Sequence, residues 1–201
     1  MSYSVQNIRN VCLLGHGGSG KSALAESLLY MTGAIDRMGK AADGNTVCDY
    51  DPEEVKRQIS ISTAVAPIEY NGCKINVLDT SGHPDFIGDT LATMQAAEMA
   101  LFVVDAVDGP QVMTTKLWRE AEDMRLSRAV YINHIDRENA NFDAAMALLH
   151  ARFGGRLGAV TIPIGQAEDF QGVIDIIRME ARYFEDGGER VEAVETLPAK
   201  Y

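Results

Sequence analysis

A glycine-rich run near the start of the chain has the spacing of a phosphate-binding loop. The run fits G-x-x-x-x-G-K-[ST] and consists of Gly15, His16, Gly17, Gly18, Ser19, Gly20, Lys21 and Ser22. Glycines allow backbone N–H groups to close around phosphate oxygens, where a Cβ would obstruct them. In such a loop the lysine reaches the β- and γ-phosphates and the next hydroxyl ligates magnesium. The run predicts a nucleoside triphosphate site with Mg²⁺; the alternative is a glycine-rich turn that caps a helix.

A second pair of residues, Asp79 and Gly82, has D-x-x-G spacing after a short apolar run. An aspartate at a strand end beside a phosphate loop can hold magnesium through water, and the glycine N–H can meet the γ-phosphate. Alone, the pattern also fits an ordinary turn. The phosphate loop upstream favours the functional interpretation.

A third group follows the apolar run at residues 129–132 and reads Asn133-His134-Ile135-Asp136. A carboxylate at that place can accept hydrogen bonds from both the N1–H and the amino group of guanine, whereas adenine presents no such pair of donors. Asp136 is therefore predicted to select guanine. A solvated turn is the alternative, because N-x-x-D is a common pattern.

Residues 33–60 form a long segment with little apolar periodicity, and a loop of that length in a compact domain is usually functional. We interpret it as a switch segment and call it the switch loop. Ser60, at its end, could close over magnesium when a γ-phosphate is present; it could equally begin the next strand. The histidines at positions 16, 83, 134 and 150 do not have the spacing of a metal site.

Alternating strand and helix patterns would position these groups. Residues 8–14 read as a strand before the phosphate loop, and Leu24, Leu28 and Met31 recur at helical spacing after it. Residues 63–70 and 73–79 predict a hairpin that turns at Asn71-Gly72. The remaining apolar runs predict two further strands and two further helices. They are the strands at 101–104 and 129–132 and the helices at 113–124 and 142–149. The alternation of strands and helices predicts an α/β fold with a mostly parallel sheet.

The pattern of apolar residues and glycines changes after residue 154. Apolar runs at 162–164 and 172–177 and a glycine pair at Gly187-Gly188 predict short strands and a hairpin. We therefore expect residues 1–154 to form one domain and residues 155–201 to begin a β-rich lobe.

Composition limits the partners. The 201-residue chain has 46% apolar residues and a formal charge of -11, which predicts a globular protein without a basic surface for free DNA. Its three cysteines are far apart, which fits neither a disulfide framework nor a metal site and indicates a reducing compartment. The sequence shows neither a leader peptide nor an apolar run long enough for a bilayer. We expect a soluble, cytoplasmic protein with no membrane partner.

Together and in this order, the motifs resemble those of the translational GTPases, specifically elongation factor G and elongation-factor-G-like proteins. The resemblance covers nearly the whole chain. It is carried by residues 7–10, 32–36, 51–61, 79–83 and 137–142, and by 162–165 with 170–175 in the insertion lobe of that family.

The resemblance implies a P-loop GTPase fold with helices on both faces of the sheet, plus the start of a β-rich insertion lobe. It also implies that the final strand and helix of the G domain are absent, so that stability and hydrolysis are impaired in this piece. GTP would be the substrate, GDP the product, Mg²⁺ the cofactor and the ribosome the partner that stimulates hydrolysis.

The same resemblance assigns roles to residues. Lys21, Ser22 and Ser60 would serve phosphate and magnesium, with Lys21 also catalytic. Asp79 and Gly82 would form the second switch, and Asn133 and Asp136 would read guanine. His83 would position the attacking water once the ribosome orders it.

Several positions depart from the family pattern. His134 replaces the usual lysine, Ser60 a threonine and Ser81 a proline, and Gly17 and Gly18 stand where an apolar residue and an aspartate are common. Translocation, ribosomal protection and recycling remain open as roles. Two alternatives to a GTPase also remain: a nucleotide-sensing module with little hydrolysis, and a P-loop ATPase of unrelated role.

Overall fold

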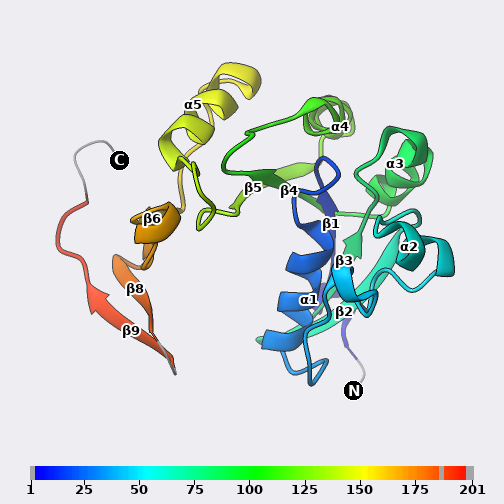
Figure 1. The fold of residues 1–201 in the computed structure, drawn as a ribbon, viewed down its shortest axis with the longest axis horizontal. Helices are drawn as coiled ribbons and strands as arrows, with labels where there is room; N and C mark the ends of the chain where they lie inside the picture. The colour runs from blue at the N-terminus through cyan, green and yellow to red at the C-terminus, as the bar shows by residue number, and fades with distance from the viewer. Residues whose placement is uncertain (1–2, 186–187, 198–201) are drawn as a thin grey trace. The chain divides into compact units, whose positions relative to one another are not determined.

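The computed structural model describes residues 3–185 and 188–197, and these fall into two compact units. The first unit contains the residues up to Val104 together with Pro110–Tyr131. The second contains Asp105–Gly109 together with the residues from Ile132 onward. Figure 1 shows the course of the chain through both.

A five-stranded sheet with the order β2-β3-β1-β4-β5 runs through the first unit. Strand β1 pairs in parallel with β3 and with β4, while β2 pairs antiparallel with β3. The mostly parallel sheet and the hairpin at Asn71-Gly72 are thus confirmed. The strands are β1 (Ile8–Leu14), β2 (Ala64–Tyr70), β3 (Cys73–Asp79), β4 (Met99–Asp105) and β5 (Ser127–Asn133).

Helices cover both faces of this sheet. Leu13 on β1 lies in one buried cluster with Ala25 and Leu29, which places α1 (Lys21–Met31) over that face. The next residue along β1, Leu14, points to the other face and is paired with Phe102. The ring of Phe102 contacts Trp118 of α4 (Val112–Asp123) with centroids 4.9 Å apart, so α4 covers the second face.

Two helices of the first unit were not predicted from the sequence. Helix α3 (Ile87–Gln95) buries only Thr90 and Met94, so its apolar stripe is too sparse to be recognised. Helix α2 (Pro52–Arg57) lies inside the switch loop, for which the sequence predicts no regular structure. It begins with a capping box between Asp51 and Glu54, and it ends where Gln58 adopts a left-handed conformation with φ of 56°.

The second unit contains α5 (Phe142–Phe153) and a four-stranded antiparallel sheet with the order β6-β7-β8-β9. This confirms the β-rich lobe. Gly188 begins β9, and Gly187, the other half of the expected turn, lies outside the described residues. The strands are β6 (Thr161–Ile164), β7 (Gly172–Asp175), β8 (Glu180–Glu185) and β9 (Gly188–Ala193).

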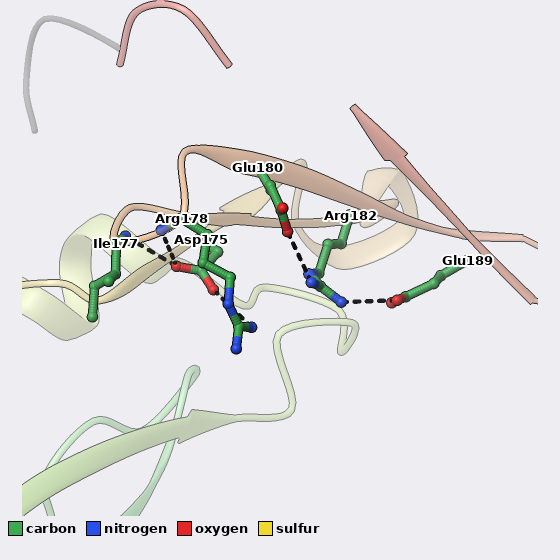
Figure 2. Close-up of polar contacts among 6 residues, drawn as sticks. All are labelled: Asp175, Ile177, Arg178, Glu180, Arg182 and Glu189. Atoms are coloured by element: carbon green, nitrogen blue, oxygen red, sulfur yellow. Dashed lines mark hydrogen bonds and ion pairs between the residues drawn. The ribbon is translucent and has the colours of Figure 1, made fainter. Parts of the chain in front are cut away.

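Polar side chains organise the connection from β7 to β8 and the β8–β9 pair (Figure 2). The Asp175 carboxylate accepts hydrogen bonds from the backbone N–H groups of Ile177 and Arg178, each at 3.0 Å. The predicted strand at 172–177 therefore ends at Asp175, where the chain turns. Arg182 bridges Glu180 and Glu189, both at 2.8 Å. These ion pairs are partly exposed, and ion pairs in contact with solvent contribute little to stability.

Cys12, Cys48 and Cys73 are all free thiols, and burial raises the pKa of Cys12 to about 12. Within the described part of the chain, the helices are all too short or too polar to cross a membrane.

Candidate functional site

The phosphate loop connects β1 to α1 in a shape that requires glycine. Gly15 has φ of 149°, and a Cβ there would lie 2.4 Å from the carbonyl oxygen of Val103 on β4. Gly20 has φ of 93° and directly precedes the first residue of α1, which is Lys21. The loop thus leads directly into the N-terminus of α1, and a helix N-terminus is a favourable place for a phosphate group.

The ammonium group of Lys21 is buried against its own loop. The residue is only 6% exposed, and Nζ donates to the carbonyl oxygens of His16 at 3.1 Å and Gly15 at 3.5 Å. Burial lowers the pKa of Lys21, and the nearby carboxylates of Asp79 and Asp49 act in the opposite direction. The Lys21 amino group therefore lies buried near the carboxylates of Asp79 and Asp49.

Gly82 contacts the phosphate loop directly. The N–H of Gly17 donates to the carbonyl oxygen of Gly82 at 3.1 Å. A Cβ on Gly82 would lie 2.5 Å from both the Gly17 nitrogen and Lys21 Nζ. No side chain fits there, so the glycine of the D-x-x-G pattern is explained by close approach to the loop.

The end of the switch loop also reaches this place. The hydroxyls of Ser60 and Ser22 are 3.0 Å apart, and the Ser81 hydroxyl donates to the Ser60 carbonyl oxygen at 2.7 Å. Since β2 begins only at Ala64, Ser60 does not start a strand. Ser60 therefore lies outside the strand, with its hydroxyl beside that of Ser22.

Asp79, the last residue of β3, brings a carboxylate close to Ser22 and Lys21. It is 1% exposed, and neither of its oxygens completes a hydrogen bond within the described residues. Burial raises the pKa of Asp79 from 3.8 to about 6, although the Ser22 hydroxyl and the Lys21 ammonium lower it. A buried, unsatisfied carboxylate beside two hydroxyls suits a hard cation that prefers oxygen ligands. Ser22, Ser60 and Asp79 therefore fit Mg²⁺.

Asp49 is a further carboxylate at this place that the sequence reasoning missed. It is 8% exposed; one oxygen accepts from the Thr46 hydroxyl at 3.2 Å, and Oδ1 has no hydrogen-bond partner among the described residues. It lies in the switch loop, and an isolated acidic residue in a polar loop carries no signal in the sequence.

His83 lies over the phosphate loop. A Cβ on Gly17 would be 2.9 Å from Nε2 of His83, so the imidazole occupies the space that a side chain at position 17 would need. The missing side chain at Gly17 and the position of His83 are thus linked.

The residues proposed to read the base lie in the second unit. His134 adopts a left-handed conformation with φ of 59°, and its Nδ1 is 2.7 Å from Oδ2 of Asp105. Arg137 Nη1 lies 3.1 Å from the same oxygen. The carbonyl oxygen of Asn133 accepts from Ala106 N–H at 2.9 Å, and the side chain of Asp136 is exposed. The residues after β5 are therefore held to those after β4.

Asp105 is the centre of that arrangement and was not singled out from the sequence. Burial raises its pKa, but hydrogen bonds from His134 and from the N–H groups of Val107 and Asp108 outweigh burial, so the pKa is lowered overall. The sequence did contain an indication of this residue, because Asp105 ends an apolar run that forms a strand, as Asp79 does.

The site combines the phosphate loop with the hydroxyls of Ser22 and Ser60, two buried aspartates and Gly82. It lies where parallel strands of the sheet end, and this combination defines a nucleotide-binding domain of the P-loop class. Residues 6–197 match the family described as the Elongation factor Tu GTP binding domain, and the chain belongs to this family. GTP binding by a translation-factor domain, with GTP hydrolysis as the reaction of that class, follows from this membership.

Individual relatives of the chain also include elongation factors. The chain is 38% identical to an elongation factor G-like protein of Thermotoga maritima and 32% identical to elongation factor G of Mycoplasma genitalium, over 98% of its length in each case. It spans only 28% and 29% of those two relatives. A crystal structure of a Thermus thermophilus protein superimposes with a TM-score of 0.88 at 35% identity, over 96% of this chain and 28% of that one. The expected resemblance to elongation factor G and the expected fold class are confirmed.

Proposed function

We propose that this chain is the GTP-binding and GTP-hydrolysing domain of an elongation-factor-G-like translation factor that acts on the ribosome in the cytoplasm. Residues 1–154 would be the G domain and residues 155–201 the start of its insertion subdomain. The observation that carries the proposal is the meeting of Ser22, Ser60 and Asp79, which come from three separate motifs, beside the phosphate loop.

Each of these residues has a place in phosphoryl transfer. The loop N–H groups of residues 15–20 and the Lys21 ammonium would neutralise the β- and γ-phosphates, and Gly82 N–H would meet the γ-phosphate. Ser22, Ser60 and, through water, Asp79 would hold Mg²⁺, which when bound supplies positive charge to the phosphate oxygens. Water attacks the γ-phosphorus in line, the bond to the β–γ bridging oxygen breaks, and GDP and phosphate leave.

His83 would orient that water. Its imidazole already lies against Gly17, at the edge of the phosphate loop. Orientation of the nucleophile is worth several powers of ten in this reaction class. We propose that the ribosome fixes the imidazole in its productive position, which would make hydrolysis ribosome-stimulated.

Selectivity for guanine would come from Asp136 and Asn133. Asp136 is exposed in the segment that follows β5, and its two oxygens would accept both donors of the guanine edge. Asp105 supports this arrangement because it fixes the residues on either side of the loop through His134 and Arg137.

The test is phosphate release from GTP by the full-length protein with and without ribosomes. We expect strong stimulation, and we expect His83→Ala to lose most of it while GDP affinity is unchanged. If the ribosome stimulates His83→Ala as strongly as the unsubstituted protein, a role of His83 in hydrolysis is excluded.

A second function is a nucleotide-sensing module that hydrolyses little. It is favoured by one observation: the imidazole at position 134, where the family carries a lysine, is engaged by Asp105 at 2.7 Å. The same assay separates the two functions, because a sensing module would bind GTP without ribosome-stimulated phosphate release.

A further inference from the structure

Glu54 is a buried carboxylate whose bonding extends beyond the helix that carries it. It is 2% exposed and occupies the third position of α2. Its Oε2 accepts from the Asp51 N–H at 3.1 Å, which completes the capping box. Capping of α2 therefore needs only one of the two oxygens.

The other oxygen, Oε1, accepts from the backbone N–H groups of Ile61 at 2.8 Å and Ser62 at 3.0 Å. These are the two residues that directly follow Ser60. The left-handed turn at Gln58 bends the chain back, so that it returns past the side chain of Glu54. One carboxylate thus accepts from both the start of α2 and the segment that carries the Ser60 hydroxyl.

We propose that Glu54 is a positioning residue that holds the Ser60 hydroxyl at the phosphate site and thereby couples closure of the switch loop to the γ-phosphate. This inference rests on the proposed function. Ser60 is fixed in the closed position by two kinds of contact: its side chain meets Ser22 and its carbonyl oxygen meets Ser81, while Glu54 fixes the two peptide groups that follow it.

A second buried carboxylate of the same region serves as a comparison. Glu26 on α1 is fully buried and accepts hydrogen bonds from the N–H groups of Gly39, at 2.9 Å, and Val47. It anchors the first half of the switch loop, and its hydrogen bonds among the described residues do not involve the peptide groups next to Ser60. Loss of Glu26 should lower stability without changing the response to the γ-phosphate.

The experiment compares the affinity of the full protein for GDP and for a non-hydrolysable GTP analogue, both with Mg²⁺. In Glu54→Gln the amide nitrogen replaces one acceptor oxygen, so either the N–H of Asp51 or those of Ile61 and Ser62 lose their acceptor. We expect affinity for the analogue to fall about tenfold relative to affinity for GDP, which corresponds to about 1.4 kcal/mol.

Two controls make the result specific. Glu53→Gln, on the exposed side of the same helix, should leave the ratio of the two affinities unchanged, and so should Glu26→Gln. An unchanged ratio in Glu54→Gln, in a protein that still binds GDP, overturns the inference. If the unsubstituted protein does not prefer GDP to ADP, the proposed function itself fails, which is a distinct outcome.

Glu54→Gln could unfold the protein, so a second measurement uses the unsubstituted chain. Amide hydrogen exchange at Ile61 and Ser62 should slow when the analogue replaces GDP, whereas exchange at Gly39 and Val47, which bond to Glu26, should not. Equal protection of Ile61 and Ser62 in both nucleotide states would overturn the inference without any substitution.

Discussion

Asp79 is costly to the ligand-free protein because its carboxylate is buried, and burial disfavours the charged form. The side chain is 1% exposed, and burial raises its pKa from 3.8 to about 6. The folded state therefore binds the proton more tightly than the unfolded state does. The resulting stability is fully present below pH 3.8 and is lost as the pH rises through 6. Asp79→Asn, which keeps the shape but removes the charge, should be free of this loss.

The size of the effect follows from the shift. A difference of about 2 pKa units corresponds to about 3 kcal/mol at 1.36 kcal/mol per unit. At about pH 7.5, without nucleotide or Mg²⁺, we expect Asp79→Asn to be about 3 kcal/mol more stable than the unsubstituted protein. At about pH 5 the unsubstituted protein is mostly protonated at Asp79 when folded, so the gap should be about 1 kcal/mol smaller.

Urea unfolding at both pH values measures this gap. Saturating GDP and Mg²⁺ should nearly close this gap at about pH 7.5, because ligand at about a hundred times its dissociation constant stabilises the folded unsubstituted protein by about 2.7 kcal/mol, whereas the Asn variant lacks the carboxylate proposed for Mg²⁺. An Asn variant that is no more stable than the unsubstituted protein, or a gap that does not depend on pH, would refute the account of Asp79.

Three further substitutions test separate parts of the site. Gly82→Ala places a Cβ 2.5 Å from Lys21 Nζ and should lower stability by about 1–3 kcal/mol in thermal unfolding, whereas Gly88→Ala, with no atom within 4 Å, should not. Asp105→Ala removes the acceptor of His134 and should weaken GDP binding about tenfold in a titration. An unchanged affinity for GDP would exclude a role of Asp105 in base binding. Asp136→Asn should shift preference from guanine to xanthine nucleotides in competition binding, and an unaltered preference would exclude Asp136 as the selector.

The sequence predicted the parts of the site that depend on backbone shape. A Cβ at Gly15 or Gly82 would clash with backbone atoms, and Gly20 has a positive φ that favours glycine. Such constraints appear in the sequence as fixed spacings. The hairpin at Asn71-Gly72 and the strand ending at Asp79 were found for the same reason, because turn chemistry and apolar runs act over short distances.

Contacts formed by tertiary structure were not predictable in this way. Asp49 and Glu54 are buried because the switch loop folds onto the phosphate site, and nothing in a polar segment shows which carboxylates will lose water. The capping box of α2 was visible as Asp51 and Glu54, but a helix of 6 residues leaves too short an apolar pattern to support it. Asp105 was overlooked although it follows an apolar run, because its partners, His134 and Arg137, lie far away in the sequence.

Calorimetric titration of the protein with GDP, GTP and ATP in the presence of Mg²⁺ tests the central claim most directly. In the function proposed here, the carboxylate of Asp136 would accept two hydrogen bonds from guanine and none from adenine, and a site that depends on such bonds discriminates by several powers of ten. We predict that GDP and GTP bind and that ATP binds far more weakly. Equal affinity for ATP would contradict both the guanine assignment and the function proposed for this chain.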